Sequence, residues 1–527
     1  MKNNNNRLIY TGAFLAATLT FGQVVQAAPL ILGGNQTIST DTTVESIVVG
    51  NSGTGPTGGD GNLTVNNGAT LTNSETNPYY FGLIGGREHY SGTGYSSLGF
   101  NIGSTGVATV TGANSLWQNS GTLSVGGLGQ GTLNIENGGG VISNYSYIGS
   151  GSGSTGTATV TGANSFWQTS IDLVINNGGL NIENGGKVIS DWGLVGNSST
   201  GAGTGVVTVT GENSLWQNSG VLFIGAHGHG ILNIENGGKV INTNTYDYGS
   251  LIGSTPEGTG VATVTGANSH WQNSGFLYVG ERGNGTLNIE DGGKVTSTTD
   301  SIISALSGST GTVTVTGANS RWESSGNLYV GGTQNGSGGN GSLIINDGGA
   351  VSATNGVTIW STGSLSGNGG TIEGDVINHG LISPGNSPGV LMITGDLTLE
   401  SDSVLLMEIF GPTAYDQLII GGNFVAGGIL ELDFGGYMPE FDVPYDLFQV
   451  AGGMSGDFSE IKFLNPAAGF DAGLLSLSFA GGENGGMFQL IMANNGDPGN
   501  NTVPEPASIL LIGLGGLAML MLRRRSP

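Results

Sequence analysis

The chain contains no cysteine and few charged residues of either sign. Among its 527 residues, Asp, Glu, Lys and Arg together account for only 9%. The absence of cysteine excludes disulfides, thiolate metal sites and cysteine nucleophiles. A disordered acidic chain would carry more charge and fewer apolar residues than the 37% present here. We therefore expect an ordered protein, compatible with export from a bacterium and with folding that needs no oxidation.

Positive charge is the scarcest feature of the composition. The chain has 12 lysines and arginines against 37 aspartates and glutamates, which gives a formal net charge of -25. Five of the basic residues lie in the terminal segments, namely Lys2, Arg7, Arg523, Arg524 and Arg525. Such an acidic body repels nucleic acid and anionic lipid, so we predict no nucleic-acid partner. The simplest interpretation of this charge is the soluble surface of a secreted protein.

The first 27 residues have the pattern of a secretory signal peptide. Lys2 and Arg7 supply the basic region, and "LIYTGAFLAATLTFG" supplies the apolar stretch. The small residues that end in Ala27 and Ala28 predict cleavage there, and Pro29 after Ala28 favours cleavage after Ala27. An uncleaved membrane anchor is the alternative. Either way, the protein is predicted to leave the cytoplasm.

Two short phrases alternate through the middle of the chain. Glycine is abundant, at 103 residues, but shows no Gly-X-Y period, which excludes collagen. The tryptophan phrase, typified by "TVTGANSLWQNSG" from Thr109, recurs at steps of 49 to 55 residues. The glycine phrase, typified by "LNIENGGKVIS" from Leu180, lies between its copies. The tryptophans of the five copies are Trp117, Trp167, Trp216, Trp271 and Trp322.

This repeat predicts an all-β solenoid. Each phrase contains a short alternating strand, a Gly/Asn turn and two further strands, so a ~50-residue repeat supplies two coils. Periods of this size indicate solenoids or propellers, and the four-strand signature of a WD-type blade is absent. We predict a right-handed parallel β-helix over residues 28–403, with the repeats at about 106–356.

The tryptophans are predicted to point into the core. The residue before each varies between Leu, Phe, His and Arg, as expected of a solvent-facing position, and the residue after is Gln or Glu. A constant tryptophan between variable neighbours is typical of a buried side chain, which adds a large apolar area to the core. The alternative is a row of exposed tryptophans that stack on sugar rings.

The candidates for chemistry are sparse. Some β-helix proteins degrade polysaccharides, and such sites need clustered acids or bases. Glu136, Glu183, Glu235 and Glu290 recur on every second coil, about 10 Å apart and without a partner base, which indicates a solvated ladder. His227 and His229 are an isolated pair and a weak metal signal. We nominate no catalytic residue, no metal site and no cofactor, and predict that the protein is not an enzyme.

The C-terminal part divides into three predicted segments. Residues 404–493 contain short apolar runs separated by Gly and Pro, which predict a small β cap. Residues 494–502 form a flexible linker. In residues 503–527, the apolar stretch Ala507–Leu522 would be about 24 Å long as a helix. Arginines at its end extend its reach towards the ~30 Å hydrocarbon core, so we predict a transmembrane helix.

Two resemblances follow from these motifs. "VPEP" at Val503–Pro506, the apolar stretch and the cluster Arg523, Arg524 and Arg525 resemble the PEP-CTERM sorting signal. The alternating phrases over about 106–351 resemble the repeat shared by type V autotransporter passengers and PEP-CTERM proteins. These resemblances imply a passenger-like β-helix, recognition of Pro504, Glu505 and Pro506 by an exosortase, and cleavage after transient anchoring in the inner membrane. A plain C-terminal tail anchor is the alternative.

The resulting hypothesis is an exported structural or adhesive protein of a Gram-negative bacterium. We expect it at the outer surface or in the extracellular matrix, in association with exopolysaccharide or biofilm, as the resemblance to PEP-CTERM proteins implies. The alternative is a polysaccharide-binding or polysaccharide-degrading protein on the same scaffold. An even, repetitive surface favours the first hypothesis, and a groove with clustered acidic or aromatic residues favours the second.

Overall fold

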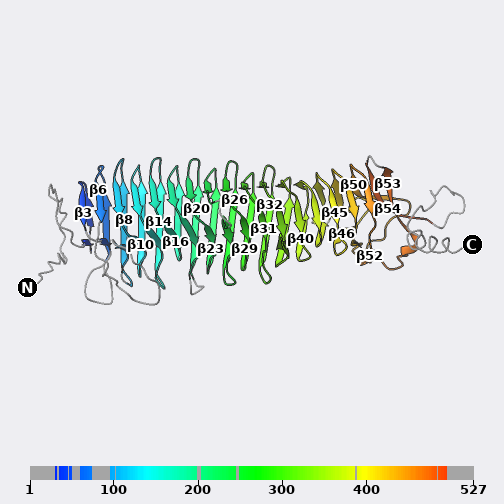
Figure 1. Cartoon of the computed structure of the whole chain (residues 1–527), viewed down its shortest axis with the longest axis horizontal. Helices are drawn as coiled ribbons and strands as arrows, with labels where there is room; N and C mark the ends of the chain where they lie inside the picture. The colour runs from blue at the N-terminus through cyan, green and yellow to red at the C-terminus, as the bar shows by residue number, and fades with distance from the viewer. Residues whose placement is uncertain are drawn as a thin grey trace, which may run out of the picture. The chain divides into compact units, whose positions relative to one another are not determined.

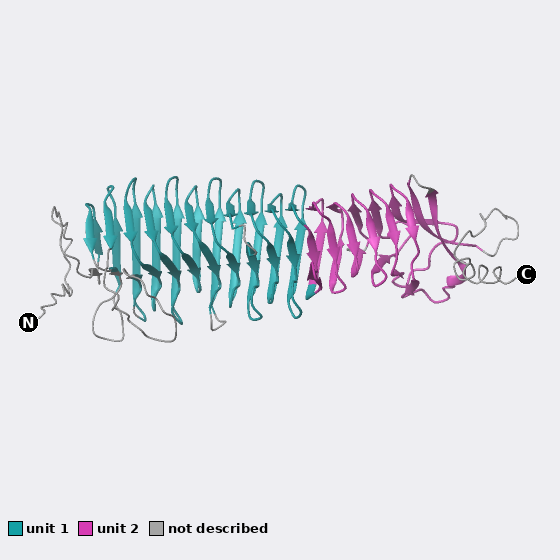
Figure 2. Ribbon diagram, in the orientation of Figure 1, with its two compact units in different colours: residues 1–326, 338–340 teal, residues 327–337, 341–527 magenta. Residues whose placement is uncertain are grey.

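A computed structural model describes residues 30–494, except 33–34, 45–46, 50–59, 74–94, 101, 199–202, 245–247, 386–387 and 483–484. The described chain is a parallel β-solenoid in which successive strands pass in turn to three sheets, here called A, B and C (Figure 1). It comprises two compact units, residues 1–326 with 338–340 and residues 327–337 with 341–527 (Figure 2). The predicted all-β parallel solenoid is confirmed. Its right-handed winding stays a prediction.

Unit 1 contains the first eleven coils, each with one strand in every sheet. Its sheet A comprises β1 (Leu30–Leu32), β4 (Ile47–Val49), β7 (Tyr95–Leu98), β10 (Thr122–Val125), β13 (Tyr145–Ile148), β16 (Asp172–Ile175), β19 (Trp192–Val195), β22 (Leu222–Ile224), β25 (Ser250–Ile252), β28 (Leu277–Val279) and β31 (Ser301–Ile303). Its sheet B comprises β2 (Asn35–Ile38), β5 (Gly61–Val65), β8 (Thr105–Thr111), β11 (Gln130–Glu136), β14 (Thr155–Thr161), β17 (Gly178–Glu183), β20 (Thr204–Thr210), β23 (His229–Glu235), β26 (Thr259–Thr265), β29 (Asn284–Glu290) and β32 (Thr310–Thr316). Its sheet C comprises β3 (Thr42–Val44), β6 (Thr70–Asn73), β9 (Leu116–Asn119), β12 (Gly140–Ser143), β15 (Phe166–Thr169), β18 (Lys187–Ser190), β21 (Leu215–Asn218), β24 (Lys239–Asn242), β27 (His270–Asn273), β30 (Lys294–Ser297) and β33 (Arg321–Ser324).

Unit 2 continues the same strand order and then departs from it. Its sheet A comprises β34 (Leu328–Val330), β39 (Val357–Ile359), β42 (Val376–Asn378), β45 (Leu397–Leu399), β48 (Phe424–Ala426) and β51 (Met454–Gly456). Its sheet B comprises β37 (Asn340–Asn346), β40 (Gly363–Gly367), β43 (Leu381–Pro384), β46 (Val404–Glu408), β49 (Ile429–Asp433) and β52 (Glu460–Leu464). Its sheet C comprises β38 (Ala350–Ala353), β41 (Gly370–Glu373), β44 (Val390–Ile393), β47 (Gln417–Ile420), β50 (Pro444–Val450), β53 (Leu475–Gly482) and β54 (Gly485–Met492). A small hairpin, β35 (Gly332–Thr333) with β36 (Gly336–Ser337), and a short 3₁₀ helix, η1 (Ala472–Leu474), complete the unit.

The core of unit 1 contains one regular column of large and small side chains. All five repeat tryptophans are at most 1% exposed, on alternate strands of sheet C. A valine occupies the same inward position on each strand between them, so Trp216 lies between Val188 and Val240 in the strand register. Alternation of large and small residues lets neighbouring coils interdigitate at close packing. The predicted inward orientation is confirmed, and the row of exposed tryptophans is excluded.

The turn between sheets B and C explains why Asn-Gly-Gly recurs in the glycine phrase. In "ENGG", Asn236 and Gly237 both adopt positive φ, at 53° and 86°. Asparagine and glycine tolerate this left-handed region better than other residues. A Cβ on the following Gly238 would lie 2.2 Å from the carbonyl oxygen of Val209 on the preceding coil. The turn therefore accepts only glycine at that position.

The predicted cap at 404–493 is divided differently in the structure. Strands β46 to β49, and then β51 and β52, still pair in parallel with the coils before them. Their side chains keep the inward and outward alternation of a coil, as in β46, where Leu405 and Met407 are buried. Strand β50 pairs in parallel with β47 on one side and antiparallel with β54 on the other, and β54 also pairs antiparallel with β53. The Phe448 and Phe488 rings stack there at 4.9 Å between centroids.

Candidate functional site

The sequence-predicted site residues lie at the two ends of the chain. The predicted signal-peptide cleavage site at Ala27 and Ala28 falls outside the described residues. The whole predicted sorting signal falls outside them too, namely Val503, Pro504, Glu505, Pro506, Arg523, Arg524 and Arg525. The same holds for the predicted transmembrane helix at 507–522 and the linker beyond residue 494. In the part of the chain that the structure describes, no helix is long and apolar enough to cross a membrane.

The predicted glutamate ladder lies on the outer face of sheet B. Glu136, Glu183, Glu235 and Glu290 each end a strand of this sheet and are half-buried. In the register, Glu183 has Thr161 and Thr210 as its neighbours, so successive carboxylates are two coils, or about 10 Å, apart. The threonines prevent any two of these carboxylates from sharing a proton or a metal ion.

Sheet C carries a line of positive charge that the sequence analysis missed. We call it the cationic column, and its members are Lys187, Lys239, His270, Lys294 and Arg321. They occupy the first position of β18, β24, β27, β30 and β33, with Leu215 of β21 between the first two. Within each strand this position faces outward, because the next residue is the buried Trp or Val of the core.

The last four members of the cationic column are direct neighbours. Lys239 is the register partner of His270, His270 of Lys294, and Lys294 of Arg321. Adjacent strands lie about 4.8 Å apart, so the four groups form a straight series with one group on every coil. Like charges placed directly opposite each other on neighbouring strands are destabilising.

One carboxylate partly offsets this repulsion. Glu323 Oε1 lies 2.9 Å from Lys294 Nζ and 3.4 Å from Arg321 Nε, with all three side chains 35–40% exposed. His270 Nε2 is 3.0 Å from Thr296 Oγ1. Burial, followed by the charges of Lys294 and Lys239, lowers the pKa of His270, and Glu323 opposes this effect. Lys187 and Lys239 have no ion pair among the described residues.

The sequence contains a signal that would have revealed this column. The lysine of "ENGGKV" and the variable residue of "GANSxW" each begin the strand that follows the turn. Aligning the two phrases at that point places Lys239 beside His270 from the sequence alone. Within either phrase alone, the lysines and the His and Arg variants give no indication that they are neighbours.

Sheet A carries two groups of aromatic side chains. Trp192 is 42% exposed, and its ring lies 6.0 Å from that of Phe223 on the next coil. Tyr248 is 49% exposed, 6.1 Å from Tyr278, which in turn stacks on Phe276 at 6.0 Å. The exposed tryptophan of unit 1 in the described chain thus lies outside the tryptophan phrase.

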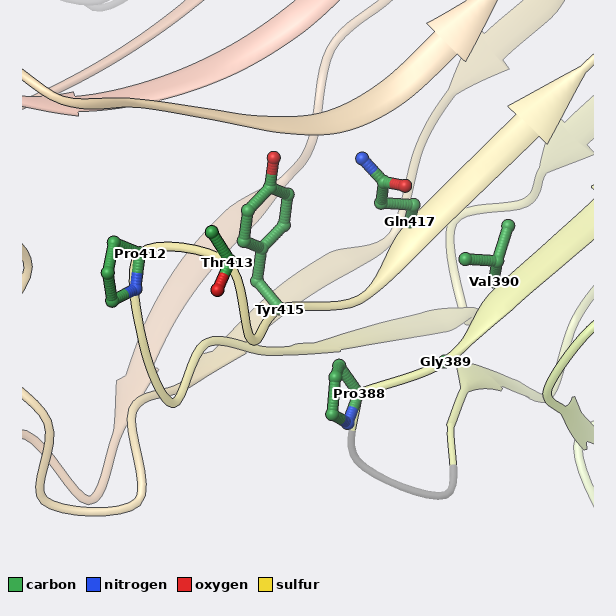
Figure 3. A pocket seen from close by; sticks show the side chains of 7 residues that line it. All are labelled: Pro388, Gly389, Val390, Pro412, Thr413, Tyr415 and Gln417. Carbon is green, nitrogen blue, oxygen red and sulfur yellow. The ribbon is translucent and has the colours of Figure 1, made fainter.

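Unit 2 contains a shallow hollow beside a buried carboxyl group. The hollow, of about 270 Å³, is lined by the turn at Pro412–Tyr415, by Pro388–Val390 and by Gln417 (Figure 3). Asp416, which lies between the lining residues Tyr415 and Gln417 in the sequence, is fully buried, and its carboxylate accepts hydrogen bonds from the N–H groups of Gly389 at 2.8 Å and Glu408 at 2.9 Å. Burial raises the pKa of Asp416 to about 7, although both hydrogen bonds lower it. Asp416 therefore links the connection before β44 to the end of β46.

The four histidines that the structure describes do not form a shared site. His227 and His229 are both exposed, on the connection that leads into β23 and on its first residue. His379 stacks on Trp360 at 5.0 Å and contacts Asp402 Oδ1 at 3.0 Å. Among the described residues, no group of three histidine, aspartate or glutamate side chains is placed to hold a metal ion.

Comparison with known proteins identifies the C-terminal segment. Residues 502–525 match the family model described as the PEP-CTERM protein-sorting motif, and this match includes the predicted Pro504–Pro506 triplet and Arg523, Arg524 and Arg525. No curated protein matches the chain. One similar solved structure is the crystal structure of a TibC-catalyzed hyper-glycosylated TibA55-350 fragment, with 14% identity, a TM-score of 0.30, and coverage of 81% of this chain and 99% of that one. The predicted relation of the repeats to autotransporter passengers stays a prediction.

The sorting motif has direct consequences for the destination of the chain. It is the substrate signal for an exosortase, so the protein is exported and processed by that class of enzyme. Its presence also places the protein at the surface or outside of a Gram-negative cell.

Proposed function

We propose that this protein is a structural or adhesive β-solenoid of the bacterial surface or extracellular matrix, associated with exopolysaccharide or biofilm and without enzymatic activity. The observation that carries the proposal is the sorting motif at 502–525, directly behind a solenoid that occupies the described chain. A solenoid offers a long repetitive surface, and the motif delivers that surface outside the cell.

The non-enzymatic role is supported by the spacing of the carboxylates on sheet B. Glycoside hydrolysis uses two carboxyl groups about 5–5.5 Å apart for retention or 6.5–9.5 Å apart for inversion. Glu183 and Glu235 are separated by a coil that carries Thr210, hence by about 10 Å, and every neighbour in the ladder repeats this spacing. The carboxylates of this ladder have equivalent surroundings, so none is set apart as a general acid or a general base.

The proposed processing begins at the Pro-Glu-Pro triplet. We propose that the two prolines separate Glu505 from the apolar segment, because a residue that precedes proline avoids the helical conformation. The apolar residues 507–522 are proposed to stop in the inner membrane, with Arg523, Arg524 and Arg525 on the cytoplasmic side because charge crosses the bilayer centre only at high cost. The triplet is then accessible to the exosortase on the far side.

The test is to replace Pro504, Glu505 and Pro506 with alanine in the producing bacterium. We expect the variant to insert normally, escape cleavage and accumulate in the membrane fraction at the uncut mass. A matched control replaces Asp497, Pro498 and Gly499 with alanine, which removes a proline and an acid from the neighbouring segment. Release of the triple-alanine variant at the normal mass would overturn the proposal, and retention of the control would show that any change near residue 500 blocks release.

A further inference from the structure

The cationic column concentrates basic residues in a chain that is otherwise strongly acidic. Four of only 12 lysines and arginines lie in it, although the chain carries 37 acidic residues. Lys239, His270, Lys294 and Arg321 follow one another on consecutive coils, and the carboxylate of Glu323 lies beside the last two. Such an arrangement costs stability in the free protein. The cost is offset when anionic groups lie along the column.

We propose that the cationic column binds a linear acidic polysaccharide with one carboxylate on each sugar residue. The polymer would lie across the strands of sheet C, along the direction in which the coils succeed one another. Its carboxylates would pair with Lys239, Lys294 and Arg321, for which arginine and lysine are the usual partners. Gln272 and Thr296, on the neighbouring outward positions of β27 and β30, are placed to bond with its hydroxyl groups.

The spacing of charge favours this ligand over nucleic acid. The column places one basic side chain on each coil, about every 4.8 Å. The fixed charges of Lys239 and Lys294 are two coils apart and those of Lys294 and Arg321 one coil apart, a spacing comparable with one or two sugar residues of an extended chain. Duplex DNA carries one negative charge about every 1.7 Å. The net charge of -25 repels such a dense polyanion more strongly than a sparsely charged one. A neutral polysaccharide would leave the column's charge uncompensated.

This inference rests on the proposed matrix role for the source of the ligand, and names its chemical class. The experiment titrates the full-length chain, purified in detergent, with an oligogalacturonate that spans the column, at low and at raised ionic strength. We expect binding that weakens with salt, because exposed charge pairs are screened. The double substitution Lys239→Gln with Lys294→Gln is expected to weaken binding about fivefold to tenfold, the size of two exposed ion pairs.

Two further variants make the result specific. Glu323→Gln removes the competing carboxylate and is expected to tighten binding. The matched control, Arg282→Gln with Lys462→Gln, removes the same charge from outside the column, where Arg282 is 59% exposed and Lys462 contacts Glu431 and Glu460. It is expected to leave the affinity unchanged once both doubles are shown by circular dichroism to be folded.

Several outcomes would overturn the inference. They are no binding by the unaltered protein, an equal loss in the control double, no gain from Glu323→Gln, or equal affinity for a neutral oligoglucoside or duplex DNA. The proposed function is tested separately, because Lys239→Gln with Lys294→Gln leaves the sorting motif intact. Normal release with lost binding supports the column, whereas normal release of the triple-alanine variant at 504–506 would overturn the sorting proposal alone.

Discussion

The hydroxyl oxygen of Ser269 accepts a hydrogen bond from the backbone N–H of Gly237, at 3.0 Å. Ser269 belongs to a tryptophan phrase and Gly237 to the glycine phrase just before it in the chain. The same bond joins Ser165 to Gly138 and Ser214 to Gly185. The serine is buried, and it satisfies an N–H group in a tight turn. The serine of "GANS" therefore connects two neighbouring coils through a hydrogen bond, and we call it the fastening serine.

Removal of the fastening serine is expected to loosen one turn. Ser269→Ala leaves the N–H group of Gly237 without its acceptor, which costs about 1–3 kcal/mol for a buried donor. We expect faster amide exchange at Gly237 and its neighbours, measured by hydrogen–deuterium exchange. Ser307→Ala, at an exposed position, is the control. Unchanged exchange at Gly237 would show that water replaces the hydroxyl at no cost.

Loss of a repeat tryptophan is expected to damage the solenoid locally. Trp216 is fully buried, and its Nε1 donates to Ser190 Oγ at 3.2 Å. Trp216→Ala should destabilise its surroundings by about 3–5 kcal/mol. Because each coil contacts only its neighbours, exchange should increase around β18, β21 and β24 and stay low in distant coils.

The exposed Trp192 provides the comparison for that experiment. Trp192→Ala should change exchange far less, since the side chain is 42% exposed. An equal effect of both substitutions would contradict the assignment of the repeat tryptophans to the core. Loss of protection along the whole of unit 1 would contradict the nearest-neighbour picture.

The buried Asp416 predicts that unit 2 weakens as pH rises. Its pKa is about 7 in the folded state against 3.8 ordinarily, so the folded state holds the proton more tightly than the unfolded state. This contribution to stability is complete below about pH 4 and is lost as pH rises to about 7. Denaturant midpoints across that interval measure the loss.

Other carboxyl groups titrate in the same range, so the test is a difference. Asp416→Asn has no such proton to lose, and its stability relative to the unaltered protein should improve as pH rises. The asparagine amide has one oxygen, whereas the N–H groups of Gly389 and Glu408 bond to two different oxygens of Asp416. The variant should therefore be less stable than the unaltered protein at low pH. Asp457→Asn, at an exposed position, is the control. Parallel curves for the Asp416→Asn variant and the unaltered protein would contradict the prediction.

The antiparallel hairpin β53–β54 is expected to protect the last coils from association. β54 pairs along β50, and Phe488 covers Phe448. Deletion of residues 475–492 exposes the edge of β50 and a buried aromatic ring, which invites pairing between molecules. We expect higher-order species by light scattering, whereas Phe441→Asp, at a side chain 49% exposed, should leave the protein monodisperse. A monodisperse deletion variant would show that the hairpin is dispensable.

The fold could be predicted from the sequence because the repeat shows which residues of each strand face the core. The alternation in "LNIE" and the constant tryptophan indicate the inward face, and both are confirmed in β11 and in the burial of Trp117. The sequence analysis left the register between the two phrases open, and it therefore missed that Lys239 and His270 are neighbours. Residues 404–464 contain neither of the two repeated phrases. Only the parallel pairing of their strands shows that they continue the solenoid. The burial of Asp416 depends on its hydrogen bonds to Gly389, 27 residues earlier, and to Glu408 at the end of β46, and no local sequence pattern predicts these contacts.

The fastening serine has a consequence for how such a chain changes over generations. Both partners of the bond, as in Gly237 and Ser269, lie within one stretch of about fifty residues. The preceding stretch is joined to this one by a different bond, from Asn236 Nδ2 to Thr210 Oγ1 at 3.1 Å. A gene segment of this length that is copied or lost in frame keeps the serine bond intact within it and brings to each border one half of the same threonine–asparagine bond. Recombination can therefore change the number of coils while the contacts between neighbouring coils stay the same.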